Sequence, residues 1–196
     1  MAGQNIVTPD AEGIAGHARA AAKSGGLPPV HLWDPPFCGD LDMRIARDGT
    51  WFYMGSPIGR KALVKLFSSI LKREGDAYFL VTPVEKVGIT VEDAPFVAVD
   101  FERRDEGGMQ VLRFTTHVGD CVDAGPDHPI RVERDRESGE PSPYVHVRAG
   151  LEALIDRKSF YRLVELGEQA EHEGAPWFGL RSGGAFFPVI PASELP

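Results

Sequence analysis

An arginine–lysine pair occurs twice in this chain, each time at the expected start of a helix. Arg60-Lys61 lies in the stretch IGRKALVKLF and Arg157-Lys158 in the stretch IDRKSFYRLV. Cations in a first helical turn face the positive end of the helix dipole, which costs about 0.3–1 kcal/mol for each partly exposed charge. An anion at that place would meet backbone N–H groups and basic side chains together. The repeated pair therefore indicates anion binding; a solvated basic turn, or pairing with nearby Asp or Glu, is the alternative.

Four further residues are candidates for the rim of such a ligand site. Thr82, Glu85 and Lys86 of the turn TPVEK place a hydroxyl, a carboxylate and an ammonium on one stiff connector. A plain surface ion pair between Glu85 and Lys86 is the structural alternative. Trp33 lies between prolines in PPVHLWDPP, where its ring either packs over a core edge or stacks on a ligand. We place these four residues at the rim of the predicted site and the two basic pairs at the anion.

The sequence contains no recognisable catalytic or metal-binding motif. GSPIGRK lacks the G-x-x-x-x-G-K-[ST] spacing of a phosphate loop, and no G-x-G-x-x-G follows an expected strand. His117, Cys121, Asp123 and His128 share one loop, but their spacing matches no standard zinc pattern. No G-x-S-x-G elbow occurs. We therefore expect no catalytic residue, metal or cofactor, and we favour a binding protein over an enzyme.

The composition is that of a globular protein with many turns. The 196 residues include 22 Gly and 16 Pro, which favours many short elements over a helical bundle. A net charge of -8 argues against general binding of nucleic acid or anionic membranes. Two cysteines are too few for a disulfide framework. The sequence has no apolar core of signal-peptide length and no apolar run approaching roughly 18 residues, so we expect a soluble cytoplasmic protein.

The first basic pair lies within a predicted β-β-α-β-β unit. Asp48-Gly49, between apolar segments, is a strong hairpin signal. Ser56-Pro57 fits the start of a helix, and Gly75 fits its end after apolar residues at helical spacing. The two strands that close the unit are predicted at residues 78–81 and 87–91.

The same order of elements returns near the C-terminus. Ala149-Gly150 predicts a hairpin, and Asp156 can cap a second helix that we expect to end near Gly174. The remaining strands are predicted at residues 96–101, 109–116, 177–180 and 186–189. Because five elements agree in order and length, we interpret the chain as an internal duplication. Chance similarity between two amphipathic helices is the alternative.

These patterns predict an α+β fold of two similar subdomains, with mainly antiparallel sheets that each pack one helix. A helix from Pro9 to Ser24 is expected in an N-terminal extension at residues 1–29. The first repeat is then expected at residues 30–93 and the second at residues 94–196.

Several long stretches of the chain are distinctive: HLWDPPFCGDLDMRIARDGTWFYMGSPIGRKALVKLFSSILKR, LVTPVEK, DAPF and PYVHVRAGLEALIDRKSFYRLVEL. Together they resemble the proteobacterial domain-of-unknown-function family 1285 over about residues 30–190. The resemblance implies a duplicated core whose C-terminal half is a pleckstrin-homology-like barrel with a helix. It also implies a groove between the halves for a nucleotide-like ligand, and a role in signalling with oxidative stress as the suggested context. The family has no assigned activity, so no catalytic residue is transferred.

The sequence thus predicts a cytoplasmic regulatory or signalling protein that binds a small anionic, nucleotide-like ligand between two subdomains. A protein-interaction adaptor that uses the barrel-like half and its sheet edges is the main alternative, so a protein partner stays open. A hydrolase or transferase using the same groove is a third reading, which needs a base such as His117 or His146 near Asp or Ser. We expect neither nucleic acid nor membrane as a partner.

Overall fold

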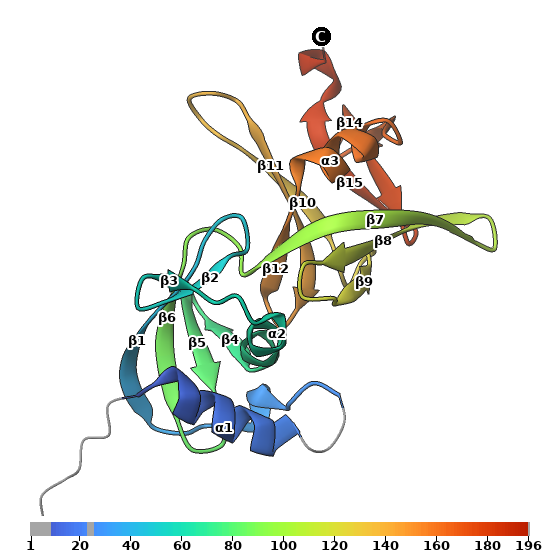
Figure 1. The fold of residues 1–196 in the computed structure, drawn as a ribbon. Helices are drawn as coiled ribbons and strands as arrows, with labels where there is room; N and C mark the ends of the chain where they lie inside the picture. The colour runs from blue at the N-terminus through green and yellow to red at the C-terminus, as the bar shows by residue number, and fades with distance from the viewer. Residues whose placement is uncertain (1–8, 23–25, 196) are drawn as a thin grey trace, which may run out of the picture. The chain divides into compact units, whose positions relative to one another are not determined.

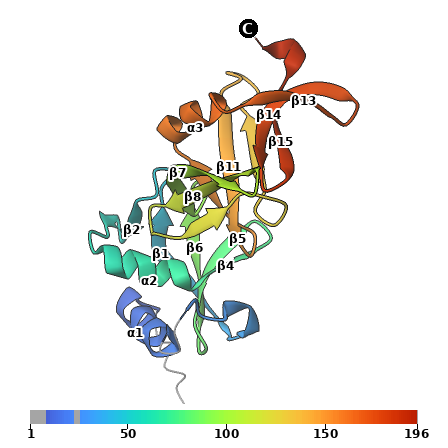
Figure 2. The same ribbon diagram turned by 90° about the vertical axis from the view of Figure 1, so that its right-hand side faces the viewer.

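The computed structural model describes residues 9–22 and 26–195, so the predicted N-terminal extension and its helix end are described only in part. The chain divides into two compact units, Met1–Asp93 and Ala94–Pro196. The described residues form three α-helices and fifteen strands, a mixed α+β fold, as predicted (Figures 1 and 2). Within this described part of the chain, no helix combines the length and the apolar character needed to cross a bilayer.

The N-terminal unit is one six-stranded sheet with two helices. Its elements are α1 (Ala11–Ala21), η2 (Val30–Leu32), β1 (Phe37–Ile45), β2 (Trp51–Tyr53), β3 (Ser56–Pro57), α2 (Lys61–Ser69), β4 (Leu71–Glu74), β5 (Ala77–Val81) and β6 (Lys86–Val91). The strand order is β3-β2-β1-β6-β5-β4, with β1 and β6 parallel and the other pairs antiparallel. α2 packs on this sheet through Phe67, whose ring stacks on Trp51 with 6.2 Å between the ring centroids.

The C-terminal unit holds a six-stranded sheet, a three-stranded sheet and one helix. Its elements are β7 (Phe96–Glu106), β8 (Met109–Thr116), β9 (Cys121–Asp123), β10 (Ile130–Arg134), β11 (Pro141–Arg148), β12 (Leu151–Ile155), α3 (Arg157–Val164), β13 (Glu168–His172), β14 (Ala175–Ser182), β15 (Ala185–Pro191) and η3 (Ala192–Glu194). The two sheet orders are β10-β11-β12-β7-β8-β9 and β13-β14-β15. In Figure 1, β7 and β8 run across β10, β11 and β12, so the larger sheet curls into a half-barrel.

Both units contain the same run of elements, which confirms the predicted duplication. A hairpin, a helix and a three-stranded meander follow one another as β1-β2, α2 and β4-β5-β6 in one unit and as β11-β12, α3 and β13-β14-β15 in the other. In the N-terminal unit the meander joins the hairpin through the parallel pair β1–β6. In the C-terminal unit the hairpin pairs in parallel with β7 instead, and the meander forms a sheet of its own.

The predicted ends of the two repeated helices were wrong, and both in the same way. The helical apolar pattern continues beyond α2 and α3, but the residues that follow each helix pair with the next strand as β4 and β13. Gly75 and Gly174, the predicted helix ends, are instead the turns of these hairpins, with φ values of 61° and 79°. Ser56-Pro57, the predicted start of the first helix, forms the short strand β3, and α2 begins at Lys61.

Arg162 of α3 binds to two residues of β7 and so connects the helix to the sheet. Its guanidinium donates to Asp100 Oδ1 at 2.6 Å and to the Phe101 carbonyl at 3.2 Å, and it lies 4.6 Å from the centre of the Phe101 ring. The hydrogen bond from Arg162 is the main cause that lowers the pKa of Asp100. Asp156 caps the same helix, as predicted, because its Oδ1 accepts the Ser159 amide at 2.7 Å.

The first prediction concerns Gly179 of β14. A Cβ at this position would lie 2.3 Å from the Phe187 carbonyl oxygen and 2.6 Å from the Phe186 ring. Because that carbonyl belongs to the paired strand β15, Gly179→Ala is expected to lower the free energy of unfolding by about 3 kcal/mol. Chemical denaturation measures the change. Gly125→Ala is the control, since its Cβ would meet nothing closer than 3.7 Å; an equal loss in both variants would contradict the packing argument.

The second prediction is a pH dependence at Asp100. Because its pKa in the folded protein is lowered from 3.8, ionised Asp100 contributes stability above that ordinary value, and the contribution is lost as the pH falls through the lowered pKa. Asp100→Asn is therefore expected to be less stable than the parent protein near neutral pH, with the difference shrinking in acid. Denaturant unfolding across the acid range measures it. Asp34→Asn removes the same charge from an exposed position and serves as the control; a pH-independent difference for Asp100→Asn would refute the assignment.

Candidate functional site

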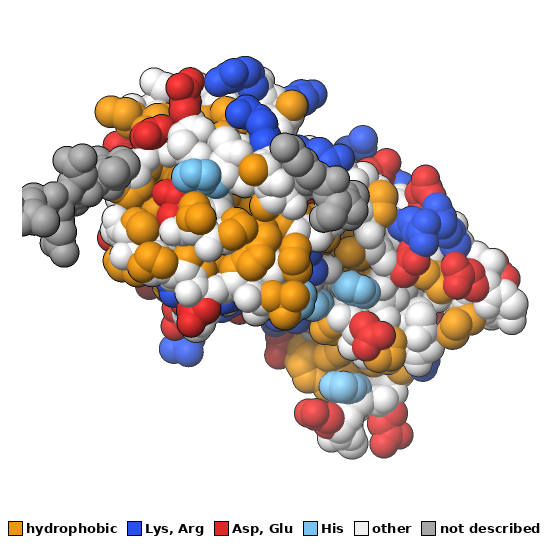
Figure 3. Space-filling model, turned by 90° about the horizontal axis from the view of Figure 1, so that it is seen from below, with side chains coloured by type: hydrophobic (Ala, Val, Ile, Leu, Met, Phe, Trp, Pro, Cys, Tyr) orange, Lys and Arg blue, Asp and Glu red, His pale blue; other side chains and the backbone are white. Residues whose placement is uncertain are grey.

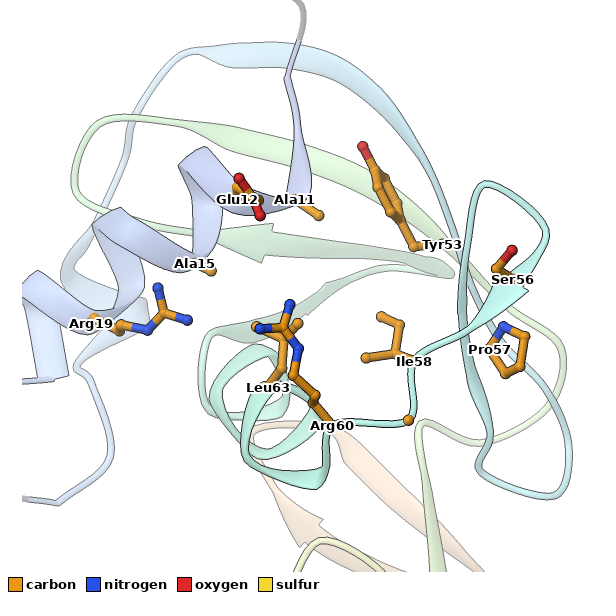
Figure 4. Close-up of a pocket in the computed structure, with 11 residues that line it drawn as sticks. Ala11, Glu12, Ala15, Arg19, Tyr53, Ser56, Pro57, Ile58, Arg60 and Leu63 are labelled. Atoms are coloured by element: carbon orange, nitrogen blue, oxygen red, sulfur yellow. The ribbon is translucent and has the colours of Figure 1, made fainter.

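The N-terminal unit contains a pocket of about 610 Å³ between α1 and the segment that leads into α2. The residues that line it are Ala11, Glu12, Ala15, Arg19, Tyr53, Ser56, Pro57, Ile58, Gly59, Arg60 and Leu63. The volume lies within the range of about 300–1,000 Å³ that is usual for small-molecule sites. In Figure 4 the guanidinium groups of Arg19 and Arg60 point into the space from opposite walls, and Ile58 projects into it between Tyr53 and Leu63.

Helix α1 builds the first wall of this pocket. The carboxylate of Asp10 caps the helix by accepting two amides of its first turn at 2.9 Å each. Ile14 is fully buried, and α1 packs against α2. Glu12, Ala15 and Arg19 recur at a spacing of three and then four residues, so they share one face of the helix. This face is the one that lines the pocket.

The start of α2 builds the opposite wall. Arg60 occupies the N-cap position with an extended backbone, and no side chain caps the helix there. Its carbonyl accepts the Leu63 and Val64 amides of the first turn. The preceding segment is held on β2, because the Ile58 amide donates to the Trp51 carbonyl at 2.7 Å. The position of the Arg60 side chain therefore follows from the hairpin that precedes the helix.

The two arginines that line the pocket differ from the other arginines of their unit. Those others each pair with a carboxylate: Arg44 with Glu92, Arg47 with Asp93 and Arg73 with Asp76. Among the described residues, Arg19 and Arg60 have no carboxylate at ion-pair distance. Two guanidinium groups for which the described residues supply no ion-pair partner thus share one concave surface, which is the arrangement that suits an anionic ligand.

Of the eight residues predicted for the site, all of them described, Arg60 is the one that lines this pocket. Lys61 follows it as the first residue of α2 and is exposed. Trp33 is half-buried at the end of η2 and is not part of the pocket wall.

The TPVEK turn is not part of the pocket lining. Thr82 is fully buried, and its hydroxyl accepts the Glu85 amide at 3.2 Å, so it closes the turn itself. Glu85 pairs with His17 of α1 at 2.5 Å, whereas Lys86 donates to Glu74 at 3.1 Å. The surface pair between Glu85 and Lys86 that we considered from the sequence is therefore wrong. Both side chains point to partners on other elements.

The second basic pair belongs to the C-terminal unit. Arg157 Nε donates to the Tyr161 hydroxyl at 3.1 Å, one turn further along α3, and this bond raises the pKa of Arg157. Lys158 is exposed and lowers the pKa of Asp100 as a minor cause beside Arg162. Because Arg60 and Arg157 lie in different units, a shared site in a groove between the halves stays a prediction.

The histidines considered as bases contact backbone groups. His117 Nδ1 accepts the Val97 amide at 3.1 Å. His146 Nε2 accepts the Gly150 amide at 3.1 Å, and its Nδ1 lies 3.1 Å from the Asp127 carbonyl oxygen. In the part of the chain that the structure describes, no group of three or more His, Cys, Asp or Glu side chains is arranged to hold a metal ion.

Sequence reasoning missed the α1 wall of the pocket. The spacing of Glu12, Ala15 and Arg19 could have shown that these residues share a helix face. It could not have shown that this face lies opposite Arg60, because that contact joins segments separated by some forty residues of chain.

One surface of the N-terminal unit is apolar. Figure 3 shows hydrophobic side chains gathered on one face of the molecule. Among the described residues of this unit, the exposed large hydrophobic side chains are Leu27, Leu32, Phe37, Met54 and Val84. Such a surface is what an interaction adaptor would use, and that alternative stays a prediction.

Two crystal structures are similar to this chain. A DUF1285 family protein from Silicibacter pomeroyi is 66% identical, with a TM-score of 0.82, and the match covers 92% of this chain and 96% of that one. A DUF1285 family protein from Shewanella baltica is 33% identical, with a TM-score of 0.51, and the match covers 64% of this chain and 91% of that one. No functionally curated protein matches.

Two family models match consecutive parts of the chain. Residues 28–94 match the model of the DUF1285 N-terminal domain, and residues 95–189 match the model of the DUF1285 C-terminal domain. Both models describe domains of unknown function. The chain therefore belongs to the DUF1285 family, whose function is unknown.

Proposed function

We propose that this protein is a regulatory binding protein whose N-terminal unit takes up a small anionic ligand in the pocket between α1 and α2. The observation that carries the proposal is the pair Arg19 and Arg60. These are the arginines of the unit that have no ion-pair partner among the described residues, and they line the same pocket.

Guanidinium groups suit this task for two physical reasons. Each presents N–H donors in a planar fork that matches a carboxylate or phosphate, and each stays charged at any pH the protein meets. Charge-assisted hydrogen bonds are also stronger than neutral ones, about 1.5–3 kcal/mol against about 1 kcal/mol. An anion bridging Arg19 and Arg60 would gain two such contacts at once, one from each wall of the pocket.

The proposal keeps the anion-binding role that the sequence predicted, but it puts the site in the pocket between α1 and α2 and not in a groove between the two units. Arg60 remains an anion-binding residue, and Arg19 of α1 takes the role that the sequence gave to the second basic pair. A nucleotide-like ligand, a signalling role and a cytoplasmic location remain finer proposals that the family resemblance suggests. Binding within one unit needs no contribution from the other.

The third prediction tests the two arginines directly. Isothermal titration calorimetry with inorganic phosphate, AMP, acetate and octanoate, each up to millimolar concentration, is expected to show binding of at least one of these anions. Arg60→Ala and Arg19→Ala should each weaken that binding about tenfold or more, since each removes a charge-assisted contact. Both side chains are exposed, so circular dichroism is expected to show an intact fold in each variant.

Arg103→Ala is the matched control for this experiment. Arg103 is an exposed arginine of β7 in the C-terminal unit and does not line the pocket. Its loss changes the net charge of the protein by the same amount, so it reports any general electrostatic effect. Binding that falls equally in all three variants, or no binding of any of the four anions, would rule out the proposed site.

A further inference from the structure

We infer that the ligand of this pocket is a monocarboxylate that carries an apolar chain or ring, an inference that rests on the proposed function and narrows its ligand class. Two properties of the lining lead to it. One is the apolar surface beneath the arginines, and the other is the net charge of the pocket.

The floor and sides of the pocket are apolar. Ile58, Leu63 and Tyr53 are half-buried and line the pocket, and Figure 4 shows Ile58 between the other two. Ala11 and Ala15 add the buried, small-residue face of α1. Exposed apolar surface in a concave site is unfavourable in water, and an apolar ligand group would remove it. An inorganic ion would contact the arginines but would leave this apolar surface exposed to water.

The charge of the lining favours a single negative charge. Arg19 and Arg60 supply two positive charges, and Glu12, on the α1 wall, supplies one negative charge. The lining therefore carries one net positive charge, on a chain whose formal charge is -8. A carboxylate neutralises that charge, whereas a diphosphate or triphosphate would bring excess negative charge close to Glu12.

The geometry also orients the ligand. In Figure 4 the guanidinium group of Arg60 lies between Arg19 and Ile58, with Leu63 beside it. The carboxylate would thus bind between Arg19 and Arg60, and the apolar part would extend over Ile58. The hydroxyls of Tyr53 and Ser56 are additional polar groups of the lining.

The fourth prediction compares two carboxylates that differ in apolar length. Burial of one methylene strengthens binding about fourfold, so burial of half of the additional methylenes makes octanoate bind about sixtyfold more tightly than acetate. Isothermal titration calorimetry with both acids, and with inorganic phosphate and AMP, measures the differences. Ile58→Ala is expected to weaken octanoate binding about tenfold and to leave acetate and phosphate unchanged. Leu63→Ala should act in the same way and serves as a second variant if Ile58→Ala folds poorly.

Val84→Ala is the matched control, because Val84 is an exposed apolar residue of the same unit outside the pocket lining. Octanoate that binds no more tightly than acetate, or AMP that binds more tightly than octanoate, would overturn the inference. If phosphate or AMP binds in an Arg60-dependent manner in that case, the proposed anion site stands and only the ligand class is wrong. If none of the four anions binds, the proposed function itself fails, and the inference fails with it.

Discussion

Trp51 of β2 joins the core of the sheet to the wall of the pocket that the start of α2 builds. Its ring is almost fully buried and stacks on Phe67 of α2, which fixes the helix on the sheet. Its carbonyl accepts the Ile58 amide and so fixes the segment that leads into that helix. One residue therefore contacts both α2 and the segment that leads to Arg60. Because aromatic pairs contribute beyond their buried area, this contact stabilises the fold and the site together.

The two copies of the duplicated unit have diverged at the helix start. In the aligned stretches IGRK and IDRK, Gly59 stands opposite Asp156. The carboxylate of Asp156 caps α3, whereas no side chain caps α2 and Arg60 occupies its N-cap position. The C-terminal copy thus satisfies its own helix terminus, a role that stabilises the fold. The N-terminal copy leaves that terminus open beside the pocket, at some cost in stability.

The sequence predicted those elements that local chemistry determines. Turn residues such as Asp48-Gly49 and Ala149-Gly150 specified their hairpins correctly, and Asp156 marked the start of α3. The predicted helix ends were wrong because Leu71 of β4 and Ala170 of β13 continue the apolar spacing of the helices before them, yet the backbones of these strands gain more by pairing with a neighbouring strand. The pocket was found only in part for a related reason. Arg60 could be found because it belongs to a basic pair at the start of a predicted helix. The place of Arg19 in the pocket depends on where α1 packs, and no short-range sequence pattern encodes that.

Helix α1 lies outside the part of the chain that matches the family's N-terminal domain. It ends at Ala21, while the match to the family's N-terminal domain begins at residue 28. Of the two arginines, Arg60 thus belongs to the shared domain and Arg19 to a segment outside it. The two walls of the pocket thus come from different parts of the chain, so the wall from α1 can change without a change in the core that supports Arg60.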